Sequence, residues 1–198
     1  NDFLSSKVFK FDIHRLISSH SESGKRLNSN CSNLASVLDY MGQDRSKFNQ
    51  YVDLVREVFP EIRDVSILKE GNPKILIWMP QSTRPDLAIP LENCGTGVGQ
   101  VLAMLAILFD SEDSKTVIID EPNSFLHPSA SRKLIDVFSR YPENQSIITT
   151  HSPEIISSSN INTILFLKIN DEGKTEIKKI DKSSQNGIRG IFTDLGIK

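Results

Sequence analysis

The chain has 198 residues, of which 38% are hydrophobic and 24% are charged, a length and balance that suit one compact domain with a buried core. The formal net charge of -2 excludes a chain that is basic overall, so composition assigns neither nucleic acid nor an anionic membrane as a partner. Two cysteines are too few for a disulfide framework, no apolar run approaches a membrane-spanning length, and the amino end lacks the apolar h-region of a signal peptide. We therefore expect a cytoplasmic protein with no membrane partner.

The amino-terminal part is expected to be extended at first, then a loop, then helical. Residues 18–33 are rich in Ser, Asn and Gly, which is typical of a loop. Apolar residues then recur at helical spacing over 33–41 and over 46–59, and Pro60 ends the second run. The interval 32–60 is therefore predicted to be a helical segment.

Two hairpins are predicted from alternating apolar residues. Segments 62–69 and 74–80 alternate around the turn residue Gly71, which favours a hairpin with one buried face, and a further strand is expected over 87–91. The tail, residues 163–180, has the same pattern around a short polar turn.

The interval 91–153 alternates helix and strand and is predicted to hold the chemistry. Residues 98–109 are nearly all apolar, as in a helix buried against a sheet, and 129–141 have helical spacing. The short apolar segments 116–120 and 146–150 are expected to be strands. Because one crossover helix separates them, they should pair in parallel through a right-handed connection.

Two acidic residues follow the first of these strands. Asp120 and Glu121 stand at its carboxyl end, before Pro122, and open α/β sheets bind ligands at that edge. Asp120 could hold Mg²⁺ beside nucleotide phosphates, and Glu121 could activate the water that attacks a γ-phosphate. A solvated turn is the alternative interpretation of the same three residues.

A histidine follows the second strand. His151 comes after the segment 146–150 and is expected at the same sheet edge as Asp120, where its ring could donate a hydrogen bond to a γ-phosphate or to the attacking water. His14 and His20 have no such neighbours in the pattern, so we interpret them as structural residues.

A glycine-rich turn precedes the apolar helix. The segment Asn93–Gln100 reads NCGTGVGQ, and closely spaced glycines at a helix amino terminus let backbone N–H groups approach an anion such as phosphate. Simple turn geometry is the alternative, since glycine-rich turns before helices are common.

The order of these three motifs resembles the carboxyl-terminal lobe of ABC-type ATPases, in particular the soluble branch with SMC-like, RecF-like and OLD (overcoming lysogenisation defect) ATPases. The resemblance covers residues 29–160. LENCGTGVGQVLAML is similar to the family's signature motif, TVIIDEP to Walker B, NSFLHPSASRKL to the D-loop, and ITTHSPEII to the switch-histidine segment; SNLASVL resembles a segment upstream of the signature. The resemblance to this family implies an α/β fold of the P-loop NTPase, ABC type. The expected fold has a largely parallel sheet with flanking helices, amino-terminal helices and a carboxyl-terminal β-hairpin.

The resemblance also implies roles for matching residues. Asp120 would bind Mg²⁺, Glu121 would be the catalytic base, and His151 the γ-phosphate switch. The family forms head-to-head dimers with shared sites, so signature residues would contact ATP held mainly by a second copy of the head. The residues implied in cofactor binding are Cys94, Gly95, Thr96, Gly97 and Gln100.

Two positions depart from the common pattern. Cys94 stands where Ser is more usual in the family. The change puts the contact of this side chain with the γ-phosphate in doubt, whereas the backbone contacts would remain. His127 stands where transporter-type relatives carry an aspartate, a variant that the soluble branch often shows, and it is a candidate dimer contact.

The sequence contains no phosphate-binding loop. Gly24 and Lys25 are followed by Arg26 rather than Ser or Thr, lack the first glycine and follow no apolar strand. We therefore expect residues 1–198 to be the carboxyl-terminal portion of an ABC-type ATPase domain whose amino-terminal Walker A lobe lies elsewhere, so that this chain alone hydrolyses ATP poorly.

The predicted function is an ATP-binding and ATP-hydrolysing head that acts as a dimerisation switch in DNA maintenance or anti-phage defence. One alternative is the ATPase portion of an OLD-like nuclease, whose TOPRIM centre would lie outside the chain because no Asp-x-Asp pair is present. Another is a non-catalytic scaffold, which the retained Asp120, Glu121 and His151 disfavour. Basic residues of the tail could form a DNA-facing strip or an ordinary solvated face: Lys168, Lys174, Lys178, Lys179 and Lys182.

Overall fold

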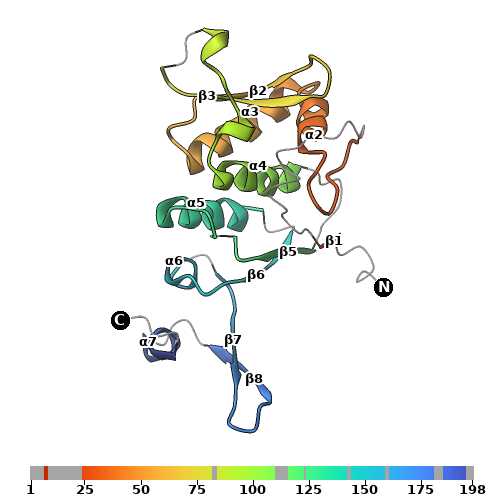
Figure 1. The fold of residues 1–198 in the computed structure, drawn as a ribbon. Coiled ribbons are helices and arrows are strands. Elements are labelled where there is room, and N and C mark those ends of the chain that lie inside the picture. The colour runs from red at the N-terminus through yellow and green to blue at the C-terminus, as the bar shows by residue number, and fades with distance from the viewer. Residues whose placement is uncertain are drawn as a thin grey trace.

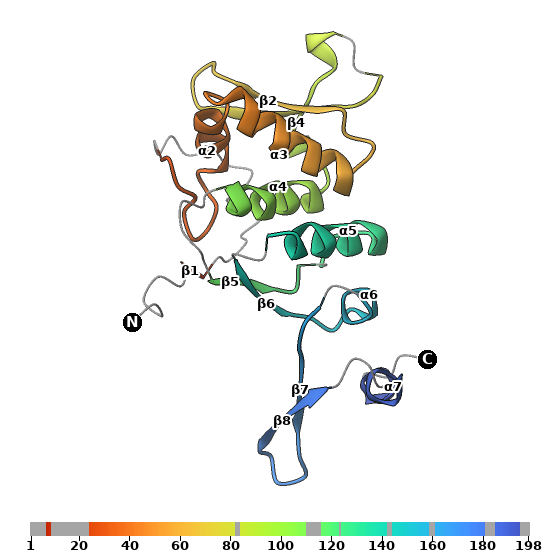
Figure 2. The same cartoon turned by 180° about the vertical axis from the view of Figure 1, so that it is seen from behind.

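A computed structural model describes most of the chain, namely residues 7–8, 24–81, 84–109, 116–122, 124–141, 144–158, 161–180 and 185–194. Figures 1 and 2 show, from two sides, a layered body of sheets and helices from which the carboxyl-terminal hairpin extends. The helices α2 to α5 occupy the middle of this body, between a small antiparallel sheet and a parallel sheet.

The parallel sheet carries the predicted site. Its strands are β1 (Lys7–Val8), β5 (Thr116–Asp120) and β6 (Gln145–Thr149), in the order β1-β5-β6. The predicted parallel pairing of β5 with β6 is confirmed, and β1 pairs in parallel with the other side of β5. Val117 and Ile119 are buried in the main core, whereas Asp120 at the strand end is exposed.

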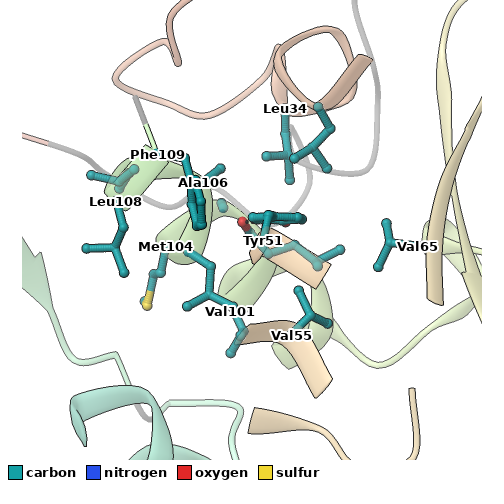
Figure 3. Packing of buried hydrophobic residues seen from close by; sticks show 14 of the residues in the cluster. Leu34, Tyr51, Val55, Val65, Val101, Met104, Ala106, Leu108 and Phe109 are labelled. Atoms are coloured by element: carbon teal, nitrogen blue, oxygen red, sulfur yellow. Dashed lines mark hydrogen bonds between the residues drawn. The ribbon is translucent and has the colours of Figure 1, made fainter. Parts of the chain in front are cut away.

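Helix α4 (Thr96–Phe109) is the centre of the main core. Every side chain from Val101 to Phe109 is buried, as its continuous apolar sequence predicts. Helix α3 (Arg45–Val58) packs on α4, and α2 (Leu34–Met41) contacts both. Figure 3 shows Tyr51 of α3 among side chains of α4.

Helix α5 (Pro128–Ser139) is the crossover between β5 and β6 and also packs against α3. Its boundaries agree with the predicted helix to within two residues at each end. In both views α4 and α5 lie on the same side of the parallel sheet.

The antiparallel sheet joins β2 (Asp64–Leu68), β3 (Lys74–Trp78) and β4 (Ile89–Pro90). The predicted hairpin of β2 and β3 is confirmed, and Gly71 adopts a positive φ of 76° in its turn, which glycine tolerates without strain. The 3-10 helices η2 (Pro85–Leu87) and η3 (Leu91–Asn93) flank β4.

The carboxyl-terminal region consists of α6 (Pro153–Ile156), the hairpin of β7 (Ile164–Ile169) with β8 (Thr175–Ile180), and α7 (Gln185–Asp194). The hairpin was predicted, and α7 was not. A second, smaller hydrophobic cluster joins these elements through Ile156, Ile180 and Ile191. Among the described residues, no helix has the length and apolar character needed to cross a membrane.

The hairpin register divides the tail lysines between two faces. Lys178 pairs with Phe166 on the face of the small cluster, whereas Lys179 pairs with Leu165 on the opposite face. Lys174 forms an ion pair with Glu172 (Nζ to Oε2, 2.8 Å). The lysines of the hairpin therefore do not form a single strip on one face that could contact DNA. Lys182 lies outside the described residues.

Candidate nucleotide site

The carboxyl ends of β5 and β6 bring Asp120, Glu121 and His151 together. Asp120 is paired in register with Thr149, the last residue of β6. The backbone N–H of Glu121 extends this ladder by donating to the Thr149 carbonyl at 3.0 Å. His151 Nδ1 lies 2.7 Å from Glu121 Oε1. The sheet edge thus gathers the three residues that the motifs predict.

Glu121 has an unusual backbone conformation. Its φ is 45°, in the left-handed region that costs a residue with a side chain about 1–3 kcal/mol. Ser124 holds the turn, because its N–H and its Oγ both donate to the Glu121 carbonyl, at 3.2 and 3.0 Å. The chain therefore leaves the strand at Glu121 while its carboxylate reaches His151.

The contact between the two side chains defines their hydrogen-bonding roles. An ionised carboxylate only accepts hydrogen bonds, so His151 Nδ1 carries the hydrogen and Nε2 faces other partners. The His151 side chain is 76% exposed, while that of Glu121 is 30% exposed. Glu121 Oε2 is buried and has no hydrogen-bond partner among the described residues. A water molecule that donates a hydrogen bond to this oxygen would satisfy it.

Asp120 has the chemistry of a Mg²⁺ ligand. Thr149 Oγ1 donates a hydrogen bond to one of its carboxylate oxygens, and the residue is exposed at the strand end. No group of three or more His, Cys, Asp or Glu residues that could hold a metal occurs within the described residues. This donor set fits Mg²⁺, which proteins often bind through one or two carboxylates with phosphate and water as the remaining ligands.

The predicted signature residues surround the amino terminus of α4. Gly95 and Thr96 are exposed there, Cys94 is partly buried, and Gln100 is 4% exposed with its Oε1 unpartnered within the described part of the chain. Burial raises the pKa of the Cys94 thiol above its usual value, so at neutral pH the sulfur is an uncharged thiol. The Sγ lies 3.6 Å from the Pro90 carbonyl.

Gly97 connects this helix terminus to the loop after Glu121. A Cβ at Gly97 would lie 2.4 Å from the Phe125 carbonyl oxygen and 2.8 Å from Leu126 Cδ2, closer than real contacts allow. Glycine is therefore required for α4 to approach the segment that follows Asp120 and Glu121. No hydrogen bond or ion pair among the described residues joins the signature residues directly to these two acids.

His127 has a structural role in this chain. It is the N-cap of α5, where its Nδ1 accepts from the Ser129 N–H at 3.3 Å and lies 2.9 Å from Ser129 Oγ, and Pro128 follows at the first helical position. Its prediction as a dimer contact stays a prediction. Thr149 and Ser124 were not among the predicted site residues, although the pairing of the two predicted strands could have pointed to Thr149 opposite Asp120.

The fold is that of P-loop NTPases of the ABC type. A solved structure from work on ATP-driven dimerization and DNA-stimulated activation of SMC ATPases matches with a TM-score of 0.61 at 15% identity, over 81% of this chain and 97% of that chain. At this identity the likeness shows the fold alone. It confirms the predicted fold class, including the parallel sheet and the carboxyl-terminal hairpin.

The chain belongs to the family of AAA domains described as putative AbiEii toxin, Type IV TA system, whose model matches residues 5–157. Two relatives share parts of the sequence. Uncharacterized protein MJ1542 of Methanocaldococcus jannaschii is 31% identical over 105 residues, 52% of this chain and 12% of that protein. The OLD nuclease of Thermus scotoductus is 26% identical over 123 residues, 57% of this chain and 23% of the nuclease. The chain thus matches less than a quarter of the length of either relative, and it is an ATPase-type domain of this family.

Proposed function

We propose that the chain is the part of an ATP-hydrolysing head that supplies the catalytic base, the γ-phosphate switch and one Mg²⁺ ligand. The observation that carries this proposal is the 2.7 Å contact of His151 Nδ1 with Glu121 Oε1 beside Asp120, at the carboxyl edge of a parallel sheet. Ligands of open α/β sheets bind at this edge.

The geometry of the three side chains supports the proposed roles. Glu121 accepts the proton of the attacking water, a task that suits a carboxylate with one buried oxygen that no described residue contacts by a hydrogen bond. His151 is held at Nδ1, which leaves Nε2 of its exposed side chain to contact a γ-phosphate. Asp120 provides a carboxylate oxygen to Mg²⁺, and the ion, when bound, neutralises developing charge on the phosphates.

The complete site is proposed to need further elements. The exposed Gly95 and Thr96 at the start of α4, with Cys94, Gly97 and Gln100, are proposed to contact ATP held by a second copy of the head. Backbone N–H groups at a helix amino terminus suit a phosphate. The Walker A lobe that grips most of the triphosphate is proposed to come from residues outside this sequence, and the head then acts as an ATP-dependent dimerisation switch.

The base role is tested in the complete protein that contains this chain. Glu121→Gln should lower ATP turnover about 100-fold or more while nucleotide binding is retained, since the amide keeps the shape but cannot take a proton. Turnover is measured by phosphate release and binding by titration with ATP and Mg²⁺. Glu57→Gln is the matched control, because Glu57 pairs with Arg140 (2.7 Å) on the helices away from the sheet edge. Unchanged hydrolysis by Glu121→Gln removes Glu121 from the base role.

A nuclease-linked head is the second candidate. The similarity to an OLD nuclease and the family description of a toxin system favour work on DNA or in defence over an unrelated ATPase role. The nuclease centre would lie outside this sequence. Metal-dependent cleavage of DNA by the complete protein would support this candidate, and intact DNA would contradict it while leaving the ATPase proposal unaffected.

A further inference from the structure

Thr149 contacts both acidic residues of the proposed site. Its hydroxyl donates to Asp120 Oδ1, and its carbonyl accepts the N–H of Glu121 at 3.0 Å. The two contacts arise from one structural cause, because Thr149 is the in-register partner of Asp120 in the parallel pairing of β5 with β6. Paired residues of neighbouring strands project from the same face of a sheet, which places this hydroxyl beside the carboxylate.

The side chain is suited to hold a carboxylate still. Threonine is branched at Cβ and has a restricted χ1, so its hydroxyl has few alternative positions. The next residue, Thr150, is also fixed by a hydrogen bond, since its Oγ1 accepts the N–H of Ser152 at 3.0 Å. A hydrogen bond to an ionised acceptor is stronger than one between neutral groups. The Asp120 carboxylate is therefore held at one oxygen, and no hydrogen bond from a described residue occupies the other.

We propose that Thr149 is a positioning residue for the divalent cation: its hydroxyl orients the Asp120 carboxylate that binds the ion. This inference rests on the proposed function, in which Asp120 is the Mg²⁺ ligand. Loss of a hydrogen bond that orients a metal-binding carboxylate typically lowers metal affinity about 10–100-fold. Thr149 lies within the switch-histidine segment, to which the motif analysis gave a role only at His151.

The same pair of strands provides a matched control. At the opposite end of the ladder, Thr116 is paired with Gln145, and Thr116 Oγ1 donates to Gln145 Oε1 at 3.3 Å. This contact joins the same two strands and is also exposed, but its acceptor is a neutral amide far from the sheet edge that carries Asp120. Replacing Thr116 by Val removes a comparable cross-strand hydrogen bond without touching the proposed cation site.

The test uses the complete protein and measures nucleotide binding as a function of Mg²⁺ concentration, with a fluorescent ATP analogue as the probe. Thr149→Val should raise the Mg²⁺ concentration for half-maximal binding about 10-fold or more. Binding in EDTA, without free Mg²⁺, should stay unchanged. Thr149→Ser keeps the hydroxyl and should behave like the parent protein, as should Thr116→Val. A Mg²⁺ dependence of Thr149→Val equal to that of Thr116→Val overturns the inference.

An Asp120→Asn variant separates failure of this inference from failure of the proposed function. If Asp120→Asn raises the Mg²⁺ concentration for half-maximal binding and Thr149→Val does not, Asp120 binds the ion without help from Thr149. In that case only the inference about Thr149 is wrong. If Asp120→Asn itself leaves the Mg²⁺ dependence unchanged, the metal role of Asp120 falls, and the role of Thr149 falls with it. Thermal unfolding in EDTA checks that each variant is folded.

Discussion

The Glu121 carboxylate is held at one oxygen by His151, its other oxygen is buried without a partner among the described residues, and its backbone lies in the left-handed region. The buried oxygen and the left-handed backbone each cost free energy that a solvated turn would avoid, since a surface Asp-Glu-Pro turn can keep both oxygens in water. The arrangement therefore argues against the turn interpretation of Asp120, Glu121 and Pro122. It is the kind of locally strained geometry that clusters at functional sites.

Gly97 has no room for a side chain, and this predicts the effect of a substitution there. Replacing a helical glycine by alanine normally adds about 1 kcal/mol of stability. At Gly97 the new Cβ would meet the Phe125 carbonyl oxygen at 2.4 Å, and backbone cannot give way as a side-chain end can. We expect Gly97→Ala to lower the free energy of unfolding by about 1–3 kcal/mol, as overpacked substitutions do. Urea denaturation measures the change.

Gly99 is the matched control for this substitution. It lies two residues further along α4, where a Cβ would meet only Leu91 side-chain atoms at 3.7–3.9 Å, which is ordinary contact. Gly99→Ala should be neutral or stabilising by up to about 1 kcal/mol. Equal effects of the two substitutions would show that the approach of α4 to Phe125 is not constrained.

At the scale of elements, the seating of α3 on α4 depends on a buried polar contact. Tyr51 is completely buried, and its hydroxyl donates to the Leu102 carbonyl at 2.9 Å. Burial raises the pKa of the Tyr51 phenol well above its usual value, so the hydroxyl stays protonated and remains a donor. Its ring also meets Phe109 edge-on, with centroids 5.9 Å apart. These contacts fix the helix that presents the signature residues.

We expect Tyr51→Phe to lower the free energy of unfolding by about 0.5–1.5 kcal/mol, because it removes the hydrogen bond and keeps the ring. Tyr40→Phe is the control: this ring is 41% exposed on α2, and a surface change of this kind stays within about 0.5 kcal/mol. Both values come from denaturant unfolding followed by fluorescence. An effect at Tyr51 no larger than that at Tyr40 would contradict a structural role for the hydroxyl.

At the scale of the whole molecule, the hydrophobic residues form two separate clusters. The main cluster surrounds α4, whereas the small one joins α6, the β7–β8 hairpin and α7. The outer face of the hairpin leaves large apolar side chains exposed by 57–70%: Leu165, Leu167, Ile169 and Ile177. An isolated two-stranded hairpin is marginally stable in water, so the small cluster is expected to open at a lower free energy than the main core.

Two isoleucines of β8 test this separation. Ile180 is 7% exposed and belongs to the small cluster, whereas Ile177 is 66% exposed on the outer face. Ile180→Ala should lower the free energy of opening of the hairpin amides by about 2 kcal/mol or more, and Ile177→Ala should change it by less than about 0.5 kcal/mol. Native-state hydrogen exchange measures both. Equal changes at the amides of α4 would show one cooperative unit instead.

Much of the fold was predictable from local pattern. Helices α2 to α5, the pairing of β5 with β6 and both hairpins follow from apolar periodicity, whose period differs between helix and strand. Helix α7 was missed, because its glycines at 187 and 190 read as loop residues and its packing against Ile180 is a tertiary contact. The pairing of β1 with β5 was likewise beyond local pattern, since it joins segments more than 100 residues apart.

The sequence by itself determined that Asp120, Glu121 and His151 lie at one sheet edge, because the carboxyl ends of parallel neighbouring strands must meet there. Three features became known only from the tertiary structure. Glu121 contacts His151 from a backbone with positive φ, the Thr149 hydroxyl donates a hydrogen bond to Asp120, and the Phe125 carbonyl lies too close to Gly97 to leave room for a Cβ there. Those three features depend on strand register and on the close packing of α4 beside the loop. Close packing depends on contacts between segments that are distant in the chain, and a local pattern gives the spacing of residues without these contacts.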